Sequence, residues 1–461
     1  MARLVVVSNR VMLPRERLSR AGGLAVALRE ALQRQGGIWF GWSGEVADRP
    51  DPIPRLTRSG KTTYATLDLS QAEHLAYYNG YANSTLWPLF HYRLGLIDFR
   101  REHYEGYRQV NQRFAHALVP QLRPDDVIWV HDYHFLPFGA ELRRANVRNR
   151  IGFFLHIPFP PPELFSALPR HRELARDLCQ YDLIGFQTEA DLHAFQRYII
   201  DEAGGVIYPD GSFEAFGLRG RAAAFPIGIE TEAFAEMARV AGASPEAKRL
   251  QESLVGRGLV IGVDRLDCTK GLPQKVEAFG DLLGRWPEHR NKVTYMQIAP
   301  VSRGEVAQYR ALRRDIEGGA GRLNGKFAEF DWVPVRYLNR SFSRPTLAGF
   351  YRASKVGFVT PFRDSMNLVA KEYVAAQDPN DPGVLVLSRF AGAARELRAA
   401  VIVNPFDVDA MAEGLHQALT MPLDERRSRH AAMMEVLRAN TLVAWREHFL
   451  SDLEAIHKQA A

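Results

Sequence analysis

The 461-residue sequence contains only two cysteines, Cys179 and Cys268. Two cysteines exclude a disulfide framework and a cysteine-based zinc site, and so sparing a use of cysteine is typical of a reducing compartment. Long apolar runs are absent as well: the apolar start at residues 4–7 is too short for a signal-peptide core, and no later run approaches the length of a membrane span. We therefore expect a cytoplasmic protein with no membrane partner.

A basic block is also missing, although the formal charge is +6 and the sequence pI is about 9.2. The basic residues lie in scattered pairs, such as Arg143-Arg144 and Arg313-Arg314, with acidic residues close by. A nucleic-acid groove needs clustered basic residues interleaved with aromatic ones. The charge pattern therefore favours anionic small molecules over nucleic acid.

Strand candidates alternate with helical stretches along most of the chain. In the first half the strand candidates are residues 4–8, 126–131, 150–156, 182–187 and 223–229. The pattern lapses in an Ala-, Glu- and Arg-rich stretch near residues 232–251, and then restarts with candidates at 259–263, 293–298, 356–360, 384–387 and 401–403. Alternating strands and helices predict parallel, doubly wound sheets.

We expect an α/β protein of two such domains, residues 1–240 and residues 241–461, with the ligand in a cleft between them. A last helical stretch at about 423–458 has an Arg-rich face that we interpret as solvated, and its end is expected to pack back on the first domain. We also expect a homo-oligomer, of a size that the sequence does not give.

The clearest candidate for a ligand site is the stretch from Phe362 to Glu372. It begins after a predicted strand and continues into a predicted helix at 368–377. Such a turn places free backbone N–H groups and the positive end of the helix dipole at the carboxyl edge of a sheet, where anions bind. Asp364 is suited to accept hydrogen bonds from sugar hydroxyls, and Glu372 to hold a ribose diol. The alternative is an ordinary strand–turn–helix with Asp364 as the N-cap.

Other predicted strands also end in polar residues. Asn9-Arg10 follows the first strand and leads to a loop with Gly22-Gly23 and a helical pattern at 24–34, which is again the geometry of an anion site, although helix packing explains it equally well. Two neighbouring strands end at His131-Asp132 and at His156. Ionisable residues at one edge of a sheet favour a site over separate core histidines.

Three cations follow strands of the second half. Arg265 and Lys270 flank a turn that ends in Gly271, and Arg303 follows the next strand. The planar guanidinium of arginine can donate two parallel hydrogen bonds to a phosphate, and the ammonium of lysine is a compact positive charge, so both side chains suit a diphosphate. Each of them alone is compatible with an ordinary surface charge, but three at one sheet edge indicate an anion site.

Over nearly its whole length the chain resembles the trehalose-6-phosphate synthases of bacterial type. The matching stretches are residues 4–10, 22–24, 39–44, 77–79, 86–88, 129–134, 152–160, 265–271, 297–304 and 366–377. The resemblance implies a GT-B fold, with two Rossmann-like domains facing each other across a cleft. It also implies transfer of glucose from a nucleotide sugar, most often UDP-glucose, to glucose 6-phosphate with retention of anomeric configuration.

The resemblance further implies roles for individual residues. Those on the donor are Arg265 and Lys270 at the diphosphate, with Gly22, Gly23 and the amides of Met366, Asn367, Leu368 and Val369 beside it, Glu372 at the ribose, and Asp364 and His156 at the glucose. Those on the acceptor are Arg10, Tyr78, Trp87 and Arg303 at the phosphate, Asp132 at the sugar and Trp42 nearby. Asp364, His156, Arg265 and Lys270 form the expected catalytic set.

Two positions depart from the family pattern, which usually has Gly at Ser365 and Tyr at Cys268. If the backbone at Ser365 has a positive φ, the side chain is strained there. If it does not, the loop is only stiffer. The departures bear on donor affinity and on the preferred base.

A retaining hydrolase needs two carboxylates that flank the anomeric carbon. The motifs offer only Asp132 and Asp364, with no obvious acid/base pair. The resemblance instead implies a front-face reaction, in which the departing diphosphate takes the acceptor proton while cations and a helix N-terminus stabilise its charge. We expect no metal and no cofactor, because the sole Asp-x-Asp, Asp407 to Asp409, is typical of a helix cap.

Three other functions stay open on the sequence. The first is a sister transferase with another phosphorylated acceptor, such as glycerol 3-phosphate, or with a cyclitol; the joint presence of Arg10, Tyr78, Trp87 and Arg303 speaks against it. The second is a catalytically silent homologue that regulates a partner. The third is a nucleic-acid binder driven by the positive charge, which salt-dependent binding to random DNA tests.

Overall fold

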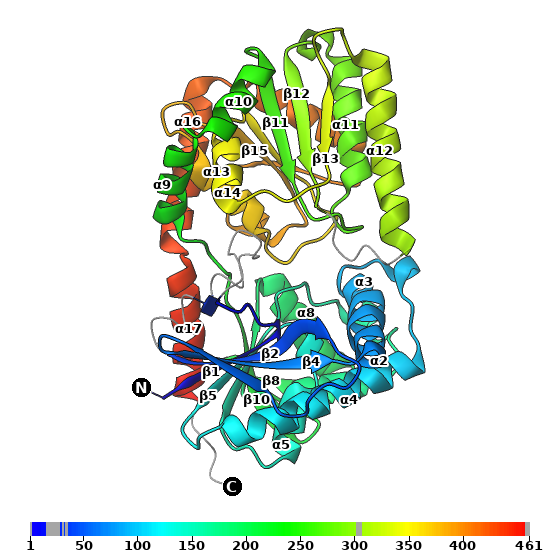
Figure 1. Ribbon diagram of the computed structural model, residues 1–461, viewed down its shortest axis with the longest axis vertical. Helices are drawn as coiled ribbons and strands as arrows, with labels where there is room; N and C mark the ends of the chain where they lie inside the picture. Colours follow the sequence, from blue (N-terminus) through cyan, green and yellow to red (C-terminus); the bar gives the residue numbers. More distant parts are fainter. Residues whose placement is uncertain (1, 15–27, 30–31, 33–35, 301–306, 457–461) are drawn as a thin grey trace. The chain divides into compact units, whose positions relative to one another are not determined.

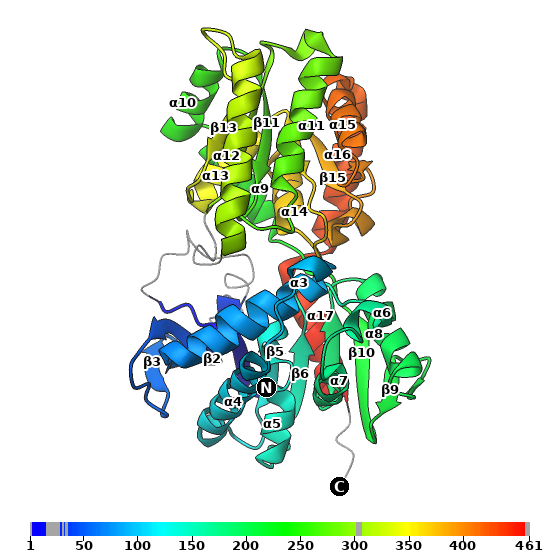
Figure 2. The same ribbon diagram turned by 90° about the vertical axis from the view of Figure 1, so that its right-hand side faces the viewer.

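The computed structural model describes residues 2–14, 28–29, 32, 36–300 and 307–456. Its contacts divide the chain into two compact units. Unit 1 holds residues 1–226 and 444–461, and unit 2 holds residues 227–443. Figures 1 and 2 show each unit as a sheet covered by helices.

Unit 1 is built on a ten-stranded sheet in the order β3-β4-β2-β1-β5-β6-β7-β10-β9-β8. The strands are β1 (Leu4–Arg10), β2 (Gly37–Val46), β3 (Arg55–Ser59), β4 (Thr62–Leu69), β5 (Val127–His131), β6 (Arg150–Phe154), β7 (Leu183–Phe186), β8 (Val206–Ile207), β9 (Ser212–Ala215) and β10 (Leu218–Ala224). The run from β4 to β10 is parallel, and β3, β9 and β8 add antiparallel edges. The chain winds outward from β1 in both directions, so β1 and β5 flank the point where the winding reverses.

Side chains alternate between the two faces of this sheet. Ile128 and Val130 of β5 join the main core, which also includes Phe114 of α4 (Arg101–Leu118). Trp129 points to the other face, where it stacks with Phe449 of α17 (Leu442–Ala455) at a centroid distance of 4.9 Å. The last helix of the chain therefore covers one face of the first sheet (Figures 1 and 2).

The other helical segments of unit 1 connect the strands. They are α2 (Gln71–Glu73), the π-helical run η2 (His74–Leu86), α3 (Trp87–Phe90), η3 (Leu94–Leu96), α4 (Arg101–Leu118), η4 (Val119–Gln121), η5 (Tyr133–Phe135), α5 (Phe138–Arg144), α6 (Pro162–Phe165), α7 (His171–Leu178) and α8 (Glu189–Asp201). Thirteen residues of π-helix are unusual, because this geometry mostly occurs as single turns, frequently at functional sites.

Unit 2 has a six-stranded, fully parallel sheet in the order β13-β12-β11-β14-β15-β16. The strands are β11 (Gly258–Val263), β12 (Val293–Ile298), β13 (Val335–Leu338), β14 (Val356–Val359), β15 (Val384–Ser388) and β16 (Val401–Val403). This is the doubly wound order 3-2-1-4-5-6, in which ligands bind where the winding reverses, outside the carboxyl ends of strands 1 and 4. Here those strands are β11 and β14.

Helices cover both faces of this sheet (Figure 1). They are α9 (Thr231–Ala241), α10 (Pro245–Leu254), α11 (Leu272–Arg285), η6 (Pro287–His289), α12 (Ala307–Phe327), α13 (Arg344–Arg352), α14 (Leu368–Ala376), η7 (Gly392–Arg395), α15 (Val408–Thr420) and α16 (Leu423–Ala439). Helix α11 packs against α12 and α15, and α9 packs against α13 and α14. Because α9 packs on unit 2, the division between the units falls at residues 226/227, whereas the composition of the sequence suggests a boundary near residue 240.

The predicted doubly wound α/β architecture is confirmed, and two of the predicted elements differ. The expected strand at 223–229 is wrong, because β10 spans Leu218–Ala224 and residues 225–229 are not part of a strand. The expected helix at 423–458 is two helices, since the chain breaks at Asn440 and Thr441 pairs with Ile229. Within the described residues, no helix combines the length and the apolar character needed to cross a membrane.

Candidate active site

The loop after β11 and the loop after β14 meet at the reversal point of the second sheet. The first loop runs from Asp264 to Gly271, which has φ of +60° and precedes α11. The second runs from Pro361 to Asn367 and leads into α14. The amide of Phe362 donates to the carbonyl of Thr269 (2.8 Å), so the two loops are joined through their backbones.

Lys270 and Asp364, one from each loop, form an ion pair. Burial opposes charge on Lys270, but Asp364 and Asp264 outweigh it, so the pKa of Lys270 is raised and the ammonium stays charged. The side-chain Nδ2 of Asn367 donates to the same carboxylate oxygen of Asp364 (3.1 Å). Arg265 lies exposed on the first loop. The structure thus brings together two of the four predicted catalytic side chains and places a third on the same loop.

The N-terminus of α14 is capped by Asn367, whose side chain accepts a hydrogen bond from the amide of Ala370 (3.1 Å). The alternative that Asp364 is the N-cap is therefore wrong. Asn367 has φ of +82°, whereas Ser365 is not among the residues with positive φ. Ser365 is buried without backbone strain, so the replacement of the usual glycine only stiffens the loop.

Glu372 lies on α14 and pairs with Arg344 of α13 (3.2 Å). Burial raises the pKa of the Glu372 carboxyl, and Arg344 opposes that shift. The carboxylate predicted to hold a ribose is therefore held in place by a neighbouring helix. Sequence reasoning missed Arg344, because no local pattern links it to a glutamate 28 residues later.

Beneath the Asp264–Gly271 loop lies a buried lysine that sequence reasoning also missed. Lys275 Nζ donates to Asp264 (2.5 Å) and to the carbonyl of Phe358 at the end of β14 (3.1 Å). Gln297 of β12 donates to the same carboxylate of Asp264 (3.3 Å). Through these contacts Asp264, the residue directly before Arg265, is held to α11, β12 and β14. The signal that the sequence holds is a lysine at helical spacing among apolar residues such as Leu272, Val276 and Phe279.

In unit 1, Arg10 and Asp132 lie at the carboxyl ends of β1 and β5, the strands that flank the reversal point. Arg10 is exposed, and its guanidinium donates to the carbonyl of Ser43. Asp132 has φ of +77°, an uncommon conformation that is frequent at functional sites. Its side chain accepts a hydrogen bond from the amide of His156 (3.3 Å).

His156 forms a chain of polar contacts with two buried neighbours. Its Nε2 lies 3.0 Å from Nδ1 of His131, and its Nδ1 lies 3.4 Å from the amide nitrogen of Gln187. With that amide as donor, His156 donates from Nε2 to His131. Burial lowers the pKa of His156 to about 3, and burial, with a smaller contribution from His156, also lowers the pKa of His131. A neutral His156 cannot act as a general acid near pH 7, so its expected role is contact with the substrate.

Trp42 and Tyr78 lie in a group of aromatic side chains. Their ring centroids are 5.3 Å apart, and Tyr78 stacks on His74 and on His134. His74 and Tyr78 are one helical turn apart on η2, so their four-residue spacing is the signal in the sequence that predicts this contact. Trp87 is buried at the start of α3. Three predicted site residues, Gly22, Gly23 and Arg303, lie outside the described residues.

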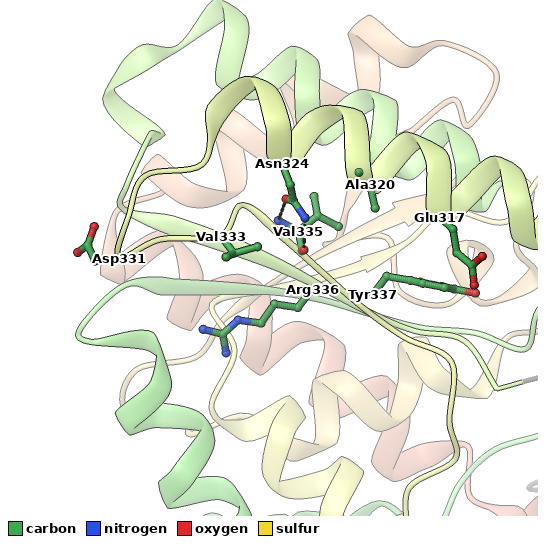
Figure 3. Close-up of a pocket in the computed structure, with 9 residues that line it drawn as sticks. Glu317, Ala320, Asn324, Asp331, Val333, Val335, Arg336 and Tyr337 are labelled. Atoms are coloured by element: carbon green, nitrogen blue, oxygen red, sulfur yellow. Dashed lines mark hydrogen bonds between the residues drawn. The ribbon is translucent and has the colours of Figure 1, made fainter.

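A cavity of about 520 Å³ lies elsewhere in unit 2, between α12 and β13 (Figure 3). Its lining includes Glu317, Asn324, Arg336 and Tyr337. In Figure 3 Glu317 and Asn324 extend from the helix toward the strand, whereas Arg336 points away from the helix. None of the predicted site residues lines this cavity, so it is not the predicted active site.

The site geometry agrees with the comparison to known proteins. The model of one family, described as glycosyltransferase family 20, matches residues 3–455. The chain belongs to glycosyltransferase family 20. Relatives of this family 20 enzyme include the trehalose-6-phosphate synthase of Sinorhizobium fredii, 51% identical over 99% of each chain. That of Cronobacter sakazakii is 50% identical, over 99% of this chain and 96% of the relative.

Solved structures of the family are similar over the whole chain. An α,α-trehalose-phosphate synthase (UDP-forming) from Burkholderia xenovorans, in complex with glucose-6-phosphate, matches with a TM-score of 0.95 and 50% identity over 98% of this chain and 100% of that one. An Escherichia coli protein bound with UDP-2-fluoro glucose matches with a TM-score of 0.94 and 49% identity over 99% and 100%. The predicted GT-B fold of this family 20 enzyme is therefore confirmed.

Proposed function

We propose that the protein transfers glucose from UDP-glucose to glucose 6-phosphate, forming α,α-trehalose 6-phosphate and UDP with retention of configuration. The observation that carries the proposal is the Lys270–Asp364 pair at the reversal point of a 3-2-1-4-5-6 sheet, in a chain about half identical to synthases solved with glucose-6-phosphate and with UDP-2-fluoro glucose.

In this proposal unit 2 binds the donor. Arg265 and Lys270 hold the diphosphate, which also receives amides at the N-terminus of α14, from Met366 to Val369. Glu372 accepts the ribose hydroxyls from its place beside Arg344. Asp364 then has two roles: its pair with Lys270 orients the lysine, and its remaining acceptor capacity serves the glucose hydroxyls. His156 remains a proposed contact of the donor glucose.

Unit 1 binds the acceptor in this proposal. Arg10, Tyr78 and Trp87 hold the phosphate together with Arg303, and Asp132 holds a sugar hydroxyl with Trp42 nearby. The exposed guanidinium of Arg10 and the strained backbone of Asp132 at adjacent strand ends support these roles. Gly22 and Gly23 remain proposed donor contacts.

The reaction proposed is a front-face displacement. The anomeric hydroxyl of glucose 6-phosphate attacks the anomeric carbon of the donor as the bond from that carbon to the diphosphate oxygen breaks, and the departing oxygen takes the hydroxyl proton. Arg265, Lys270 and the α14 amides stabilise the negative charge that develops on UDP. No divalent metal is required, because these groups already neutralise the leaving group.

Product analysis tests the proposal. The protein is incubated with a panel of nucleotide-glucose donors and of acceptors that includes glucose 6-phosphate, glucose and glycerol 3-phosphate, with and without a chelator. We expect trehalose 6-phosphate by mass spectrometry, the α,α configuration by NMR, and unchanged activity under chelation. A product from glycerol 3-phosphate alone would establish the sister transferase, and no turnover with any donor would establish a silent homologue. Cytoplasmic location and homo-oligomer formation remain predictions.

A further inference from the structure

Two histidines and a glutamate gather at the end of α11 that is remote from the proposed donor site. Glu288 and His289 lie in η6, and His416 lies on α15. One ligand atom from each of the three side chains lies within 4.8 Å of the others. Because α11 has 14 residues, this Glu288–His289–His416 cluster is about 20 Å from Gly271. It takes no part in the proposed reaction.

The two imidazoles meet edge to face, with ring centroids 5.2 Å apart and planes inclined by 69°, and their surroundings hold them there. His289 Nε2 and His416 Nδ1 are 2.9 Å apart. The ring of His416 stacks on Trp286, with centroids 4.4 Å apart and planes within 10°. The backbone amide of His289 donates to the carbonyl of Trp286 (3.1 Å). Since η6 follows α11, and α11 packs along α15 (Figure 2), the ring positions are set by packed helices.

The geometry is close to that of two ligands on one ion. With zinc–nitrogen bonds of about 2.0–2.1 Å and tetrahedral angles, two coordinated nitrogens lie about 3.3 Å apart. The rings need to separate by only about 0.4 Å to admit an ion.

The third group completes a plausible donor set. Glu288 is exposed and offers carboxylate oxygens beside the imidazoles, which leaves one tetrahedral position for water. Two imidazoles with a carboxylate suit zinc, nickel and copper better than magnesium or calcium, which prefer all-oxygen sites. Lys292 also acts electrostatically on His289 and opposes a bound cation, so we expect moderate affinity.

We propose that the Glu288–His289–His416 cluster binds one divalent transition-metal ion, with zinc as the best fit, and that the ion ties η6 to α15 and stabilises unit 2. In the alternative, the two histidines share only a hydrogen bond, and the protein binds no metal ion at these residues.

Titration of zinc into metal-free, untagged full-length protein distinguishes them. We expect one zinc ion per chain by isothermal titration calorimetry, visible absorption of tetrahedral type when cobalt(II) replaces zinc, and a higher melting temperature with zinc. Loss of outer partners alone costs about 10- to 100-fold in metal affinity. His416→Ala should therefore weaken zinc binding by about 100-fold or more and abolish the cobalt spectrum.

Three variants keep the test decisive. His289→Ala should behave as His416→Ala does, and Glu288→Gln should weaken zinc less. His193→Ala replaces an exposed histidine of unit 1 and should leave binding unchanged. Circular dichroism checks that each variant is folded, and His416, only partly buried, is the safer substitution if His289→Ala misfolds. Absence of zinc binding, or equal binding by wild type and His416→Ala, would overturn the proposal.

Discussion

At the residue scale, the proposed donor site depends on two cations in one loop. Arg265→Ala and Lys270→Ala should each lower kcat/KM by about 100- to 1,000-fold, because loss of one such donor costs about 3–4 kcal/mol of transition-state stabilisation. Lys248→Ala, which removes an exposed lysine of α10, is the matched control. The measurement is initial rate with both substrates varied, alongside a thermal melt that shows the variants folded. Normal rates in both site variants would refute the donor assignment.

The His131–His156 pair should make stability dependent on pH. Both rings have a lowered pKa in the folded protein, His156 from 6.5 to about 3. Between those pH values the unfolded chain binds more protons than the folded protein does. The stabilisation that comes from the two neutral rings should therefore be fully present above about pH 6.5. Below that pH the free energy of unfolding should fall, by up to about 1.4 kcal/mol per pH unit for each proton.

Urea unfolding at several pH values on either side of about 6 measures that slope. His131→Asn should reduce the slope, whereas His193→Gln, at an exposed position, should not. Equal slopes in wild type and His131→Asn would show that the pair does not titrate as described.

At the element scale, the start of α14 depends on Asn367. Asn367→Ala should cost about 0.5–2 kcal/mol for the lost cap and about 1–2 kcal/mol more for placing a Cβ-bearing residue without a local hydrogen bond at φ of +82°. Asn367→Gly should cost only a few tenths of a kcal/mol, because glycine accepts this backbone conformation. Chemical denaturation of both variants compares them; a glycine variant less stable than the alanine variant would contradict the cap assignment.

Helix α17 should be anchored by its aromatic side chains. Trp445 is 4% exposed and lies against Trp129 (5.0 Å between centroids) and Phe154 (5.1 Å). Trp445→Ala should lower the free energy of unfolding by about 3–5 kcal/mol, and hydrogen exchange should rise in residues 442–455. The control is His448→Ala, an exposed position on the same helix. An unchanged exchange rate in the Trp445 variant would mean that other contacts hold the helix.

At the scale of the whole molecule, the proposed acceptor site must distinguish glucose 6-phosphate from glucose. Hydrogen bonds to charged groups contribute about 1.5–3 kcal/mol each, so Arg10 and Arg303 together should favour the phosphorylated acceptor by about two to four orders of magnitude. Arg10→Ala should lower kcat/KM for glucose 6-phosphate by about 10- to 100-fold and leave UDP affinity nearly unchanged.

Steady-state rates with both acceptors and calorimetry with UDP measure these effects. Arg58→Ala, an exposed arginine of β3, is the matched control. If the intact protein used glucose as well as glucose 6-phosphate, or if Arg10→Ala weakened UDP binding as much as acceptor use, the acceptor assignment would be wrong.

Short-range patterns in the sequence determine many of the strands of this protein and the residues at their ends. Apolar β-branched runs followed by polar turns predicted β1, β5, β6, β11, β12 and β14, because strand and turn preferences act over a few residues. The same patterns placed Arg10, Asp132, Arg265 and Asp364 at strand ends. Asp407 caps α15 as predicted, and its side chain accepts from Ala410 (3.0 Å). The weakly apolar edge strands β3, β8 and β9 escaped notice, since pairing with a neighbour rather than their own pattern makes them strands.

Only the tertiary structure decided which of these residues meet. Lys270 pairs with a carboxylate 94 positions away, Lys275 contacts β14, and Glu372 is held by Arg344, because the strand order brings distant loops to one edge of the sheet. The return of α17 to unit 1 was expected, but the aromatic packing on Trp129 that holds it there is not revealed by any periodicity of the helix. Sequence patterns report local preferences, whereas partners far apart in the chain are selected by burial and by charge compensation in the folded protein.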